Sequence, residues 1–256
     1  FFLPTYGVLL ALAFLSALWL AARLGRRIGL ESDRVTDVGI VAALVGIVGA
    51  KIGMYLFDWR YFSEHPSEIL ALTTLQAAGV FQTGLILALL AAIWYIRRKR
   101  MPMLATFDVF APGLALGHAV GRLGCFAAGC CWGSACTLPW AVTFRDPFAH
   151  ERFGTPLNVP LHPSQLYESG AEFAIFAFLM WMFNRRGRDG ALLGWYLVLY
   201  SAVRFAIEFV RYHDQPLRAG LSLTQWISLA LLPVGVWLLA RARVSSRLAT
   251  QSERSP

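Results

Sequence analysis

Apolar residues fill long stretches of this chain, and seven of these stretches are long enough to cross a bilayer. They cover residues 5–22, 36–57, 79–96, 104–124, 164–183, 191–210 and 221–240. A helix needs about 20 apolar residues to traverse the hydrocarbon core. The pattern therefore predicts an all-α, polytopic integral membrane protein with seven transmembrane helices.

Basic residues follow alternate stretches. Fifteen of the 23 Lys and Arg residues come after the first, third, fifth and seventh stretches, and only five lie on the other side. Because basic loops stay in the cytoplasm, we expect the N-terminus outside and the C-terminus inside. No basic start and no convincing cleavage site accompany residues 5–22, so we expect a retained helix there rather than a signal peptide.

Two outer segments differ from the apolar stretches. Residues 58–78 mix aromatic with acidic side chains, which is typical of a short helix lying in the membrane interface. Residues 126–163 contain five prolines, which predict an irregular outer (periplasmic) head or lid rather than a helix. Since no internal repeat is evident, we expect residues 1–256 to form a single membrane domain.

Composition narrows the class further. Hydrophobic residues make up 57% of the chain and charged residues 15%, which excludes a disordered protein. The formal net charge of +8 does not indicate nucleic acid as a partner, because the basic residues gather at the ends of apolar stretches instead of on one soluble face.

A few ionisable residues lie inside the stretches, among them Lys51, Arg122, Arg204 and Glu208. A charge at the centre of a membrane helix costs about 2.5–3.5 kcal/mol on insertion scales, so each is by default a functional candidate. Structural alternatives remain open. Arg204 and Glu208 lie four residues apart and could pair to lock the bundle, and Lys51 could bond to backbone carbonyls.

One helix face combines three polar groups. His118, Arg122 and Cys125 follow the i, i+4, i+7 rule. His118 is either an interhelical hydrogen bonder or a catalytic group. A guanidinium presents a planar fork that matches phosphate oxygens, and Arg122 and Arg204 fall at the expected depth of outer-leaflet phosphates. These residues predict phospholipid handling, by an enzyme or by a transporter.

The four cysteines fall within twelve residues, at positions 125, 130, 131 and 136. In an oxidising compartment, the pattern favours a structural disulfide between Cys136 and either Cys130 or Cys131. Zinc is disfavoured because C-x4-C-C-x4-C lacks the C-x2-C pairs of structural sites, and a redox role would need a C-x-x-C pair. We expect no metal and no cofactor.

An ordered set of short segments extends over nearly the whole chain. They are Tyr6-Gly7, Gly49–Gly53, Gly79–Gly84, Phe107–Val109, Gly121–Phe126, Pro139-Trp140, His162–Glu168, Arg204–Arg211 and Ser222–Gln225. In these segments the chain resembles the prolipoprotein diacylglyceryl transferase family.

The resemblance implies transfer of the diacylglyceryl group of phosphatidylglycerol to the thiol of a lipobox cysteine in a prolipoprotein. A thioether forms and glycerol phosphate leaves. Arg122 and Arg204 match the family arginines that hold the lipid phosphate. The resemblance further implies a multi-pass protein of the bacterial cytoplasmic (inner) membrane, with its active site toward the periplasm. We expect a monomer with membrane lipids as its other partners.

The chain departs from the family pattern at two places. Gln82 occupies the position of the catalytic histidine, and a run with two asparagines and an acid reads Cys125, Ala128 and Cys130. Glutamine is no base near neutral pH. We therefore hypothesise that His118 deprotonates the acceptor thiol and is oriented by a carboxylate such as Glu208. His162 is a second candidate base, or else a cap or loop hydrogen bonder.

Several further residues are expected to bind substrate. They are Tyr6, Lys51, Gln82, Cys125, His162, Gln165, Tyr167, Glu168 and Arg211. Ser164 suits an N-cap, with Tyr167 and Glu168 in the first helical turn, so this motif either holds the lid or lines the site. Alternative functions are a paralogue that uses another acceptor and a non-enzymatic phospholipid-binding or flipping protein.

Overall fold

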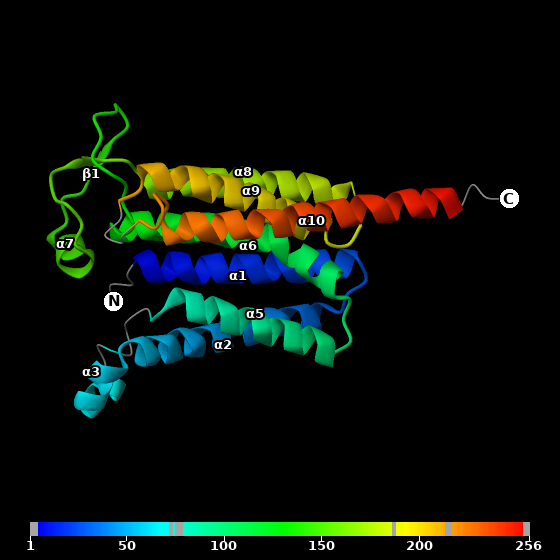
Figure 1. Cartoon of the computed structure of the whole chain (residues 1–256), viewed down its shortest axis with the longest axis horizontal. Helices are drawn as coiled ribbons and strands as arrows, with labels where there is room; N and C mark the ends of the chain where they lie inside the picture. Colours follow the sequence, from blue (N-terminus) through cyan, green and yellow to red (C-terminus); the bar gives the residue numbers. More distant parts are fainter. Residues whose placement is uncertain (1–4, 72–73, 75–78, 186–187, 213–216, 253–256) are drawn as a thin grey trace. The chain divides into compact units, whose positions relative to one another are not determined.

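Helices dominate the computed structural model, which describes residues 5–71, 74, 79–185, 188–212 and 217–252, with the backbone alone for 243–252. The elements are α1 (Thr5–Arg27), α2 (Ser32–Phe57), α3 (Trp59–Glu64), η1 (Pro66–Leu70), α5 (Phe81–Arg98), α6 (Met103–Ala128), β1 (Val142–Thr143), α7 (Pro147–Phe153), β2 (Pro160–Leu161), α8 (Ser164–Asn184), α9 (Ala191–Ile207), η2 (Glu208–Val210) and α10 (Leu223–Ser252) (Figure 1). Each predicted apolar stretch coincides with one long helix.

Six of the described helices are long and apolar enough to cross a membrane, namely α1, α2, α6, α8, α9 with the residues up to Val210, and α10. The helix α5 is not among them. Its 18 residues include Gln82 and end in Arg97 and Arg98, so its apolar part is shorter than that of the others.

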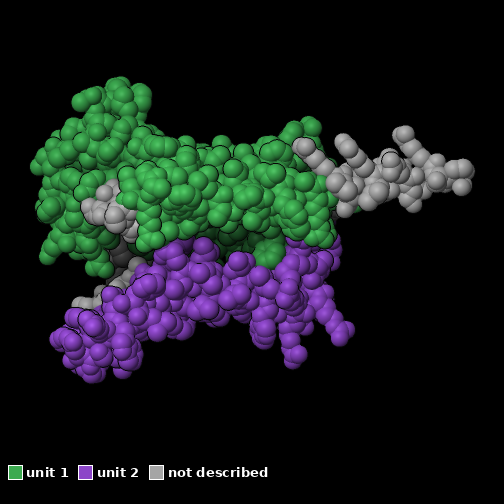
Figure 2. Space-filling view, in the orientation of Figure 1, with its two compact units in different colours: residues 1–21, 107–256 green, residues 22–106 purple. Residues whose placement is uncertain are grey.

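The chain forms two compact units, which Figure 2 colours separately. Unit 1 comprises residues 1–21 and 107–256, and unit 2 comprises residues 22–106.

The core of unit 1 lies among α6, α8 and α9. Ala111 and Ala115 of α6 are fully buried against Ile175 and Leu179 of α8. Larger side chains of α8 and α9, including Trp195, surround them. Alanine at the contact lets α6 approach α8 closely, as is usual for helices packed in membranes.

Glycines bring other helix backbones of unit 1 together. A Cβ atom at Gly235 of α10 would lie 2.9 Å from the carbonyl oxygen of Gly194 in α9. A Cβ atom at Gly113 of α6 would lie 2.7 Å from the carbonyl oxygen of Ala17 in α1. These positions accept no side chain without a shift of the backbone, which explains why glycine occupies them.

The start of α9 is held by a side chain of α6. The Asp108 carboxylate accepts hydrogen bonds from the backbone N–H groups of Gly190, at 2.6 Å, and Leu193, at 2.8 Å. These donors have no partner within the helix, so a carboxylate at this end satisfies them and also meets the positive end of the helix dipole. Asp108, the central residue of the segment Phe107–Val109, therefore has a structural role at the start of α9.

Unit 2 is built on the pair α2 and α5. The Val80 N–H group donates to the Ala50 carbonyl at 2.9 Å, and the Tyr95 hydroxyl donates to Asp37 at 2.6 Å. The Lys51 ammonium donates to the Thr74 carbonyl at 2.6 Å. Lys51 thus makes the kind of backbone bond that its structural alternative predicts, and its role toward substrate stays a prediction.

The two outer segments are only partly as predicted. Within 58–78 a short helix is present as α3, followed by η1; residues 72–73 and 75–78 lie outside the described part. Within 126–163, α6 continues to Ala128 and most of the remainder is irregular. The absence of a helix was wrong for Pro147–Phe153, because Pro147 stands at a helix N-terminus, where it is tolerated, and Asp146 caps it.

Candidate active site

The Glu168 carboxylate of α8 is the centre of a buried polar cluster in unit 1. Its Oε1 atom accepts from Arg122 Nη2 of α6 at 2.8 Å and lies 3.9 Å from Arg204 Nε of α9. Its Oε2 atom lies 4.0 Å from Arg211 Nη1. Three guanidinium groups from separate parts of the chain therefore surround one carboxylate.

His118 lies in the same cluster, one turn before Arg122 on α6. Its Nε2 atom is 3.2 Å from Glu168 Oε1, and its Nδ1 atom is 3.1 Å from Glu172 Oε1. Arg122 Nε donates to His118 Nε2 at 3.3 Å, a bond that only the neutral ring can accept. Both protonation states of the ring therefore have partners: the two carboxylates stabilise the imidazolium, and Arg122 stabilises the neutral imidazole.

A second ion pair adjoins the cluster. Arg204 Nη1 lies 2.6 Å from Glu208 Oε2, which confirms the predicted pairing of these residues four positions apart. The Ser222 hydroxyl donates to the other Glu208 oxygen at 2.7 Å, and the Ser222 N–H group donates to Gln225. The segment Ser222–Gln225 thus anchors Glu208, which in turn positions Arg204.

Arg211 follows η2 and is fixed by its backbone. Gly133 pairs with Arg211 in an antiparallel bridge, so the loop after α6 and the end of η2 lie side by side. Burial lowers the pKa of the Arg211 guanidinium, and the charges of Arg122 and Arg204 lower it further. The carboxylates of Glu168, Glu172 and Glu208 formally balance the three guanidinium charges, so a further anion would be recognised by the guanidinium N–H donors that these carboxylates do not engage.

The N-terminus of α8 holds the loop after α6. Ser164 is the first residue of the helix and not its N-cap, which corrects the sequence prediction. Its hydroxyl donates to the Cys131 carbonyl at 2.9 Å, and Gln165 Nε2 donates to the Cys130 carbonyl at 2.7 Å. Both side chains are buried, so this motif orders the loop beside the cluster.

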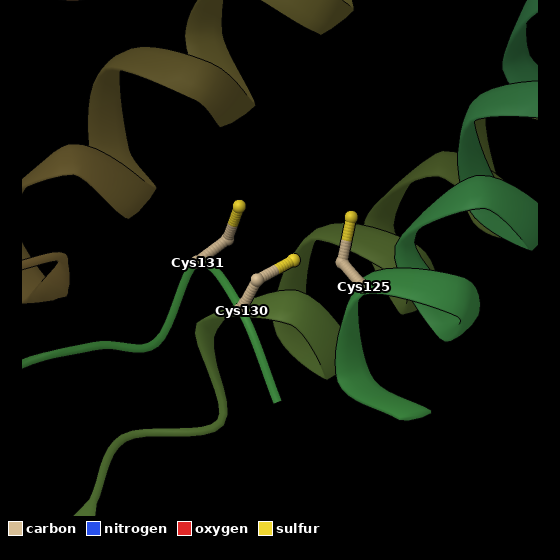
Figure 3. Close-up of side chains that lie close together, drawn as sticks. All are labelled: Cys125, Cys130 and Cys131. Atoms are coloured by element: carbon tan, nitrogen blue, oxygen red, sulfur yellow. The ribbon is translucent and has the colours of Figure 1, made fainter. Parts of the chain in front are cut away.

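The predicted disulfide is wrong: all four cysteines lie in the described part of the chain, and each is a free thiol. The fold instead brings Cys125, at the end of α6, to the adjacent pair Cys130 and Cys131 (Figure 3). Hydrogen bonds from the Cys125 and Cys130 thiols, with the positive charges of Arg211 and Arg122, hold the pKa of the Cys131 thiol far below its usual range.

His162 and Tyr167 belong to a second place in unit 1. Trp140 Nε1 donates to the Tyr167 hydroxyl at 2.7 Å, and His162 Nδ1 lies 3.2 Å from the same oxygen. These three side chains and Leu138, with the end of α9, line a cavity of about 470 Å³. Its lining is mostly apolar and open to the surface, so it would accept an apolar part of an amphiphilic substrate.

Most predicted site residues belong to unit 1, where the fold gathers them, and two belong to unit 2. His118, Arg122, Glu168, Arg204 and Arg211 meet directly, with Glu208 and Gln165 beside them as described above. The Tyr6 ring packs against Gly124, one residue before Cys125. Lys51 and Gln82 belong to unit 2, where Gln82 lies in the first turn of α5.

One expected contact was wrong, and one residue was missed. Glu208 pairs with Arg204, and the carboxylates that face His118 are Glu168 and Glu172. Glu172 is fully buried in an apolar stretch. The rule that singled out Arg122 and Glu208 applies equally to Glu172, since an acid at that depth needs a partner.

The chain matches known proteins along most of its length. A family model described as prolipoprotein diacylglyceryl transferase matches residues 1–241. A protein of Nitratidesulfovibrio vulgaris (strain DSM 19637 / Miyazaki F) named phosphatidylglycerol–prolipoprotein diacylglyceryl transferase is 36% identical, over 93% of this chain and 89% of its own. Proteins of the same name from Clostridium tetani and Methylobacillus flagellatus are 31% and 33% identical, each covering 91% of this chain and 90% of their own.

Proposed function

Because this chain belongs to the prolipoprotein diacylglyceryl transferase family, we propose that it transfers diacylglyceryl from phosphatidylglycerol to a prolipoprotein cysteine. The acceptor sulfur attacks the carbon of the diacylglyceryl group that is bonded to the phosphate oxygen. A C–S bond forms and the C–O bond breaks, and the electron pair leaves with glycerol phosphate. The thiol proton passes to a base of the enzyme, since the thiolate is the nucleophile.

The observation that carries this proposal is the cluster of Arg122, Arg204 and Arg211 around Glu168. Each guanidinium has five N–H donors, and Glu168 and Glu208 engage only part of them. Because the carboxylates fix the guanidinium groups, the remaining N–H donors are already oriented before a phosphate binds. Donors that are preorganised where negative charge grows on the leaving phosphate lower the barrier to its departure.

His118 is the base of this proposal. Its Nε2 atom is unprotonated when it accepts from Arg122, and the imidazolium formed on proton uptake faces Glu168 and Glu172. The two carboxylates offset the new charge at once. His162 is the second candidate, because it lines the apolar cavity beside Tyr167.

The membrane arrangement belongs to the same proposal. All seven long helices span the cytoplasmic membrane of a bacterium, with the N-terminus outside and the site toward the periplasm. Residues 126–163 form an outer head, 58–78 lie in the interface, and the chain acts as a monomeric, single membrane domain. The distribution of arginines supports this orientation.

The direct test is a transfer assay in vesicles that contain phosphatidylglycerol. A lipobox peptide should gain the mass of one diacylglyceryl group while glycerol phosphate is released; a peptide with serine in place of cysteine should gain nothing. Consumption of phosphatidylglycerol without a peptide adduct would point to another acceptor. Binding of the lipid without consumption would contradict an enzyme altogether.

The base is tested by paired variants. His118→Gln should abolish transfer while a matched His65→Gln variant keeps it, because His65 is exposed and stacks on Tyr61 in unit 2. Wild-type turnover in His118→Gln with loss in His162→Gln would move the base to the cavity.

A further inference from the structure

The three clustered cysteines have no role in the transfer chemistry derived above. The sulfur atoms of Cys125, Cys130 and Cys131 all lie within 4.8 Å of one another. Cys136 is a free thiol outside this group. The sequence spacing argued against a metal, but spacing alone does not reveal that the end of α6 brings Cys125 back to the adjacent pair.

We propose that the thiolates of Cys125, Cys130 and Cys131 bind one soft metal ion of the Zn²⁺ class, whose fourth coordination position is filled from outside the chain. Thiolate sulfur selects soft and borderline ions such as Zn²⁺ and Cu⁺. With a Zn–S bond of about 2.3 Å, a tetrahedral site places its sulfurs roughly 3.8 Å apart, so an inward movement of about 1 Å suffices.

The backbone conformation between Cys125 and Cys131 brings the three cysteine side chains toward one another. Cys131 has a φ of 63° and Gly129 a φ of 73°, so the chain turns through the left-handed region twice in three residues. Figure 3 shows the Cys130 sulfur directed toward Cys125. An uncommon conformation at a non-glycine residue persists only where its surroundings enforce it.

The surroundings that enforce it are buried. Ser164 and Gln165 hold the carbonyl groups of Cys131 and Cys130, and the Cys130 N–H group donates to the Cys125 carbonyl at 3.1 Å. All three cysteines are thus tied to α6 or α8 through the backbone. A metal ion would find its ligands in place and would not have to order a loose loop.

Charge is compatible with such a site. On metal binding, three metal–sulfur bonds form, the S–H bonds of any protonated ligands break, and those protons pass to solvent. The resulting complex of three thiolates and one Zn²⁺ carries a net charge of −1. Arg122 lies on α6 less than one turn before Cys125, and Arg211 is bridged to Gly133, two residues after Cys131, so both guanidinium groups belong to segments next to the sulfurs. A partly buried anionic complex needs such counter-charges, and these two guanidinium groups provide them.

The fourth ligand is the acceptor thiol. This assignment of the fourth ligand rests on the proposed function. An ion held by three protein ligands keeps one position open, as catalytic zinc sites do. When the acceptor binds, a metal–sulfur bond forms and the S–H bond breaks, and the proton passes to His118. A coordinated thiol is deprotonated outright, so the acceptor would be held as a thiolate beside the arginine cluster.

The site is tested first with Co²⁺ alone on the purified, reduced protein. One ion per chain should bind and give sulfur-to-cobalt charge-transfer absorption that Zn²⁺ removes. Cys125→Ser, Cys130→Ser and Cys131→Ser should each lose this absorption, and Cys136→Ser, the matched control, should keep it. Absence of binding in the wild type, or equal loss in Cys136→Ser, would overturn the site.

Alkylation gives a readout that does not depend on spectra or folding of the variants. With Zn²⁺ present, only Cys136 should react with iodoacetamide, and a chelator should expose all four thiols. Equal reaction with and without Zn²⁺, or a disulfide within the cluster in protein from its membrane, would contradict the proposal.

The fourth ligand is tested by adding a lipobox peptide to the Co²⁺ form. The cysteine peptide should alter the charge-transfer band, and the serine peptide should not. An unchanged band would overturn the acceptor as fourth ligand while leaving the metal site intact. Failure of the proposed function is separate, because it would abolish thioether formation without affecting Co²⁺ binding.

Discussion

At the scale of single residues, the arginines of the cluster cannot be judged by alanine substitution alone. Glu168 and Glu208 are both buried, and Arg204 contacts both of them. Removal of one partner from a buried ion pair destabilises a protein by about 3–5 kcal/mol, because the remaining charge is left uncompensated. An inactive Arg204→Ala variant could therefore simply be misfolded, which makes the charge-conserving change more informative.

We expect Arg122→Lys and Arg204→Lys to fold but to lose transfer activity by at least about tenfold, equivalent to about 1.4 kcal/mol in the barrier. Lysine keeps the charge beside Glu168 but not the planar fork that binds two phosphate oxygens. Transfer rates in phosphatidylglycerol vesicles provide the measurement. Arg218→Lys is the control, since Arg218 is exposed and bonds through its backbone. Normal rates in both cluster variants would refute bidentate phosphate binding.

Glu172 should act only through His118. Its Oε1 atom faces His118 Nδ1 at 3.1 Å, so Glu172→Gln replaces a carboxylate that stabilises the imidazolium with a neutral group of the same size. We expect kcat to fall about tenfold with KM for phosphatidylglycerol unchanged, the signature of an interaction that strengthens in the transition state. A rise in KM with unchanged kcat would instead assign Glu172 to lipid binding.

At the scale of helices, the contact of α9 with α10 depends on glycine. A Cβ at Gly235 would lie 2.9 Å from both the Gly194 carbonyl oxygen and a methyl group of Val198. We expect Gly235→Ala to lower stability by about 1–3 kcal/mol, as overpacking commonly does, visible as a lower unfolding temperature in detergent.

The control for that variant is Gly170 on α8, where a Cβ atom would have no neighbour within 4 Å. Gly170→Ala should be neutral or stabilising by up to about 1 kcal/mol, because alanine favours the helix. Equal effects of the two alanines would show that helix propensity, and not the backbone contact, governs Gly235.

Sequence reasoning reached the helices more easily than the site. Apolar length and arginine position located every long helix, because both follow from the cost of placing polar groups in lipid. Pairings four residues apart on one helix, such as Arg204 with Glu208, also follow from local geometry. Contacts between helices do not, and so the partner of His118 was assigned to Glu208 instead of to Glu168 and Glu172.

The cysteines also show that contacts between segments far apart in the sequence are not predicted by local spacing. Their spacing suggested a disulfide with Cys136, but the fold sets that residue apart and brings Cys125 to the pair. The approach depends on the left-handed backbone at Gly129 and Cys131 and on bonds from Ser164 and Gln165, which lie about 35 residues away in the chain. No local pattern encodes a contact of that kind.

At the scale of the whole molecule, α5 decides the topology. Six spanning helices would put both termini on one side of the membrane, and seven put them on opposite sides. The apolar part of α5 ends at Ile96, but Arg97, Arg98, Lys99 and Arg100 follow it directly. Long basic side chains at a helix end reach back to the interface, so a short apolar segment can still span.

We therefore expect seven spans, which fusion reporters can test. A fluorescent protein joined after residue 256 should fluoresce in the cytoplasm, and alkaline phosphatase joined there should be inactive. Phosphatase inserted in the outer head, near Asp146, should be active. Removal of the four basic residues 97–100 should reduce the orientation bias because it removes about a quarter of the cytoplasmic positive charge. Phosphatase inserted near Ser63, in the segment between α2 and α5, should also be active. An inactive insertion there, together with an active head insertion, would show that α5 does not cross the membrane, because only α5 and α6 separate the two positions.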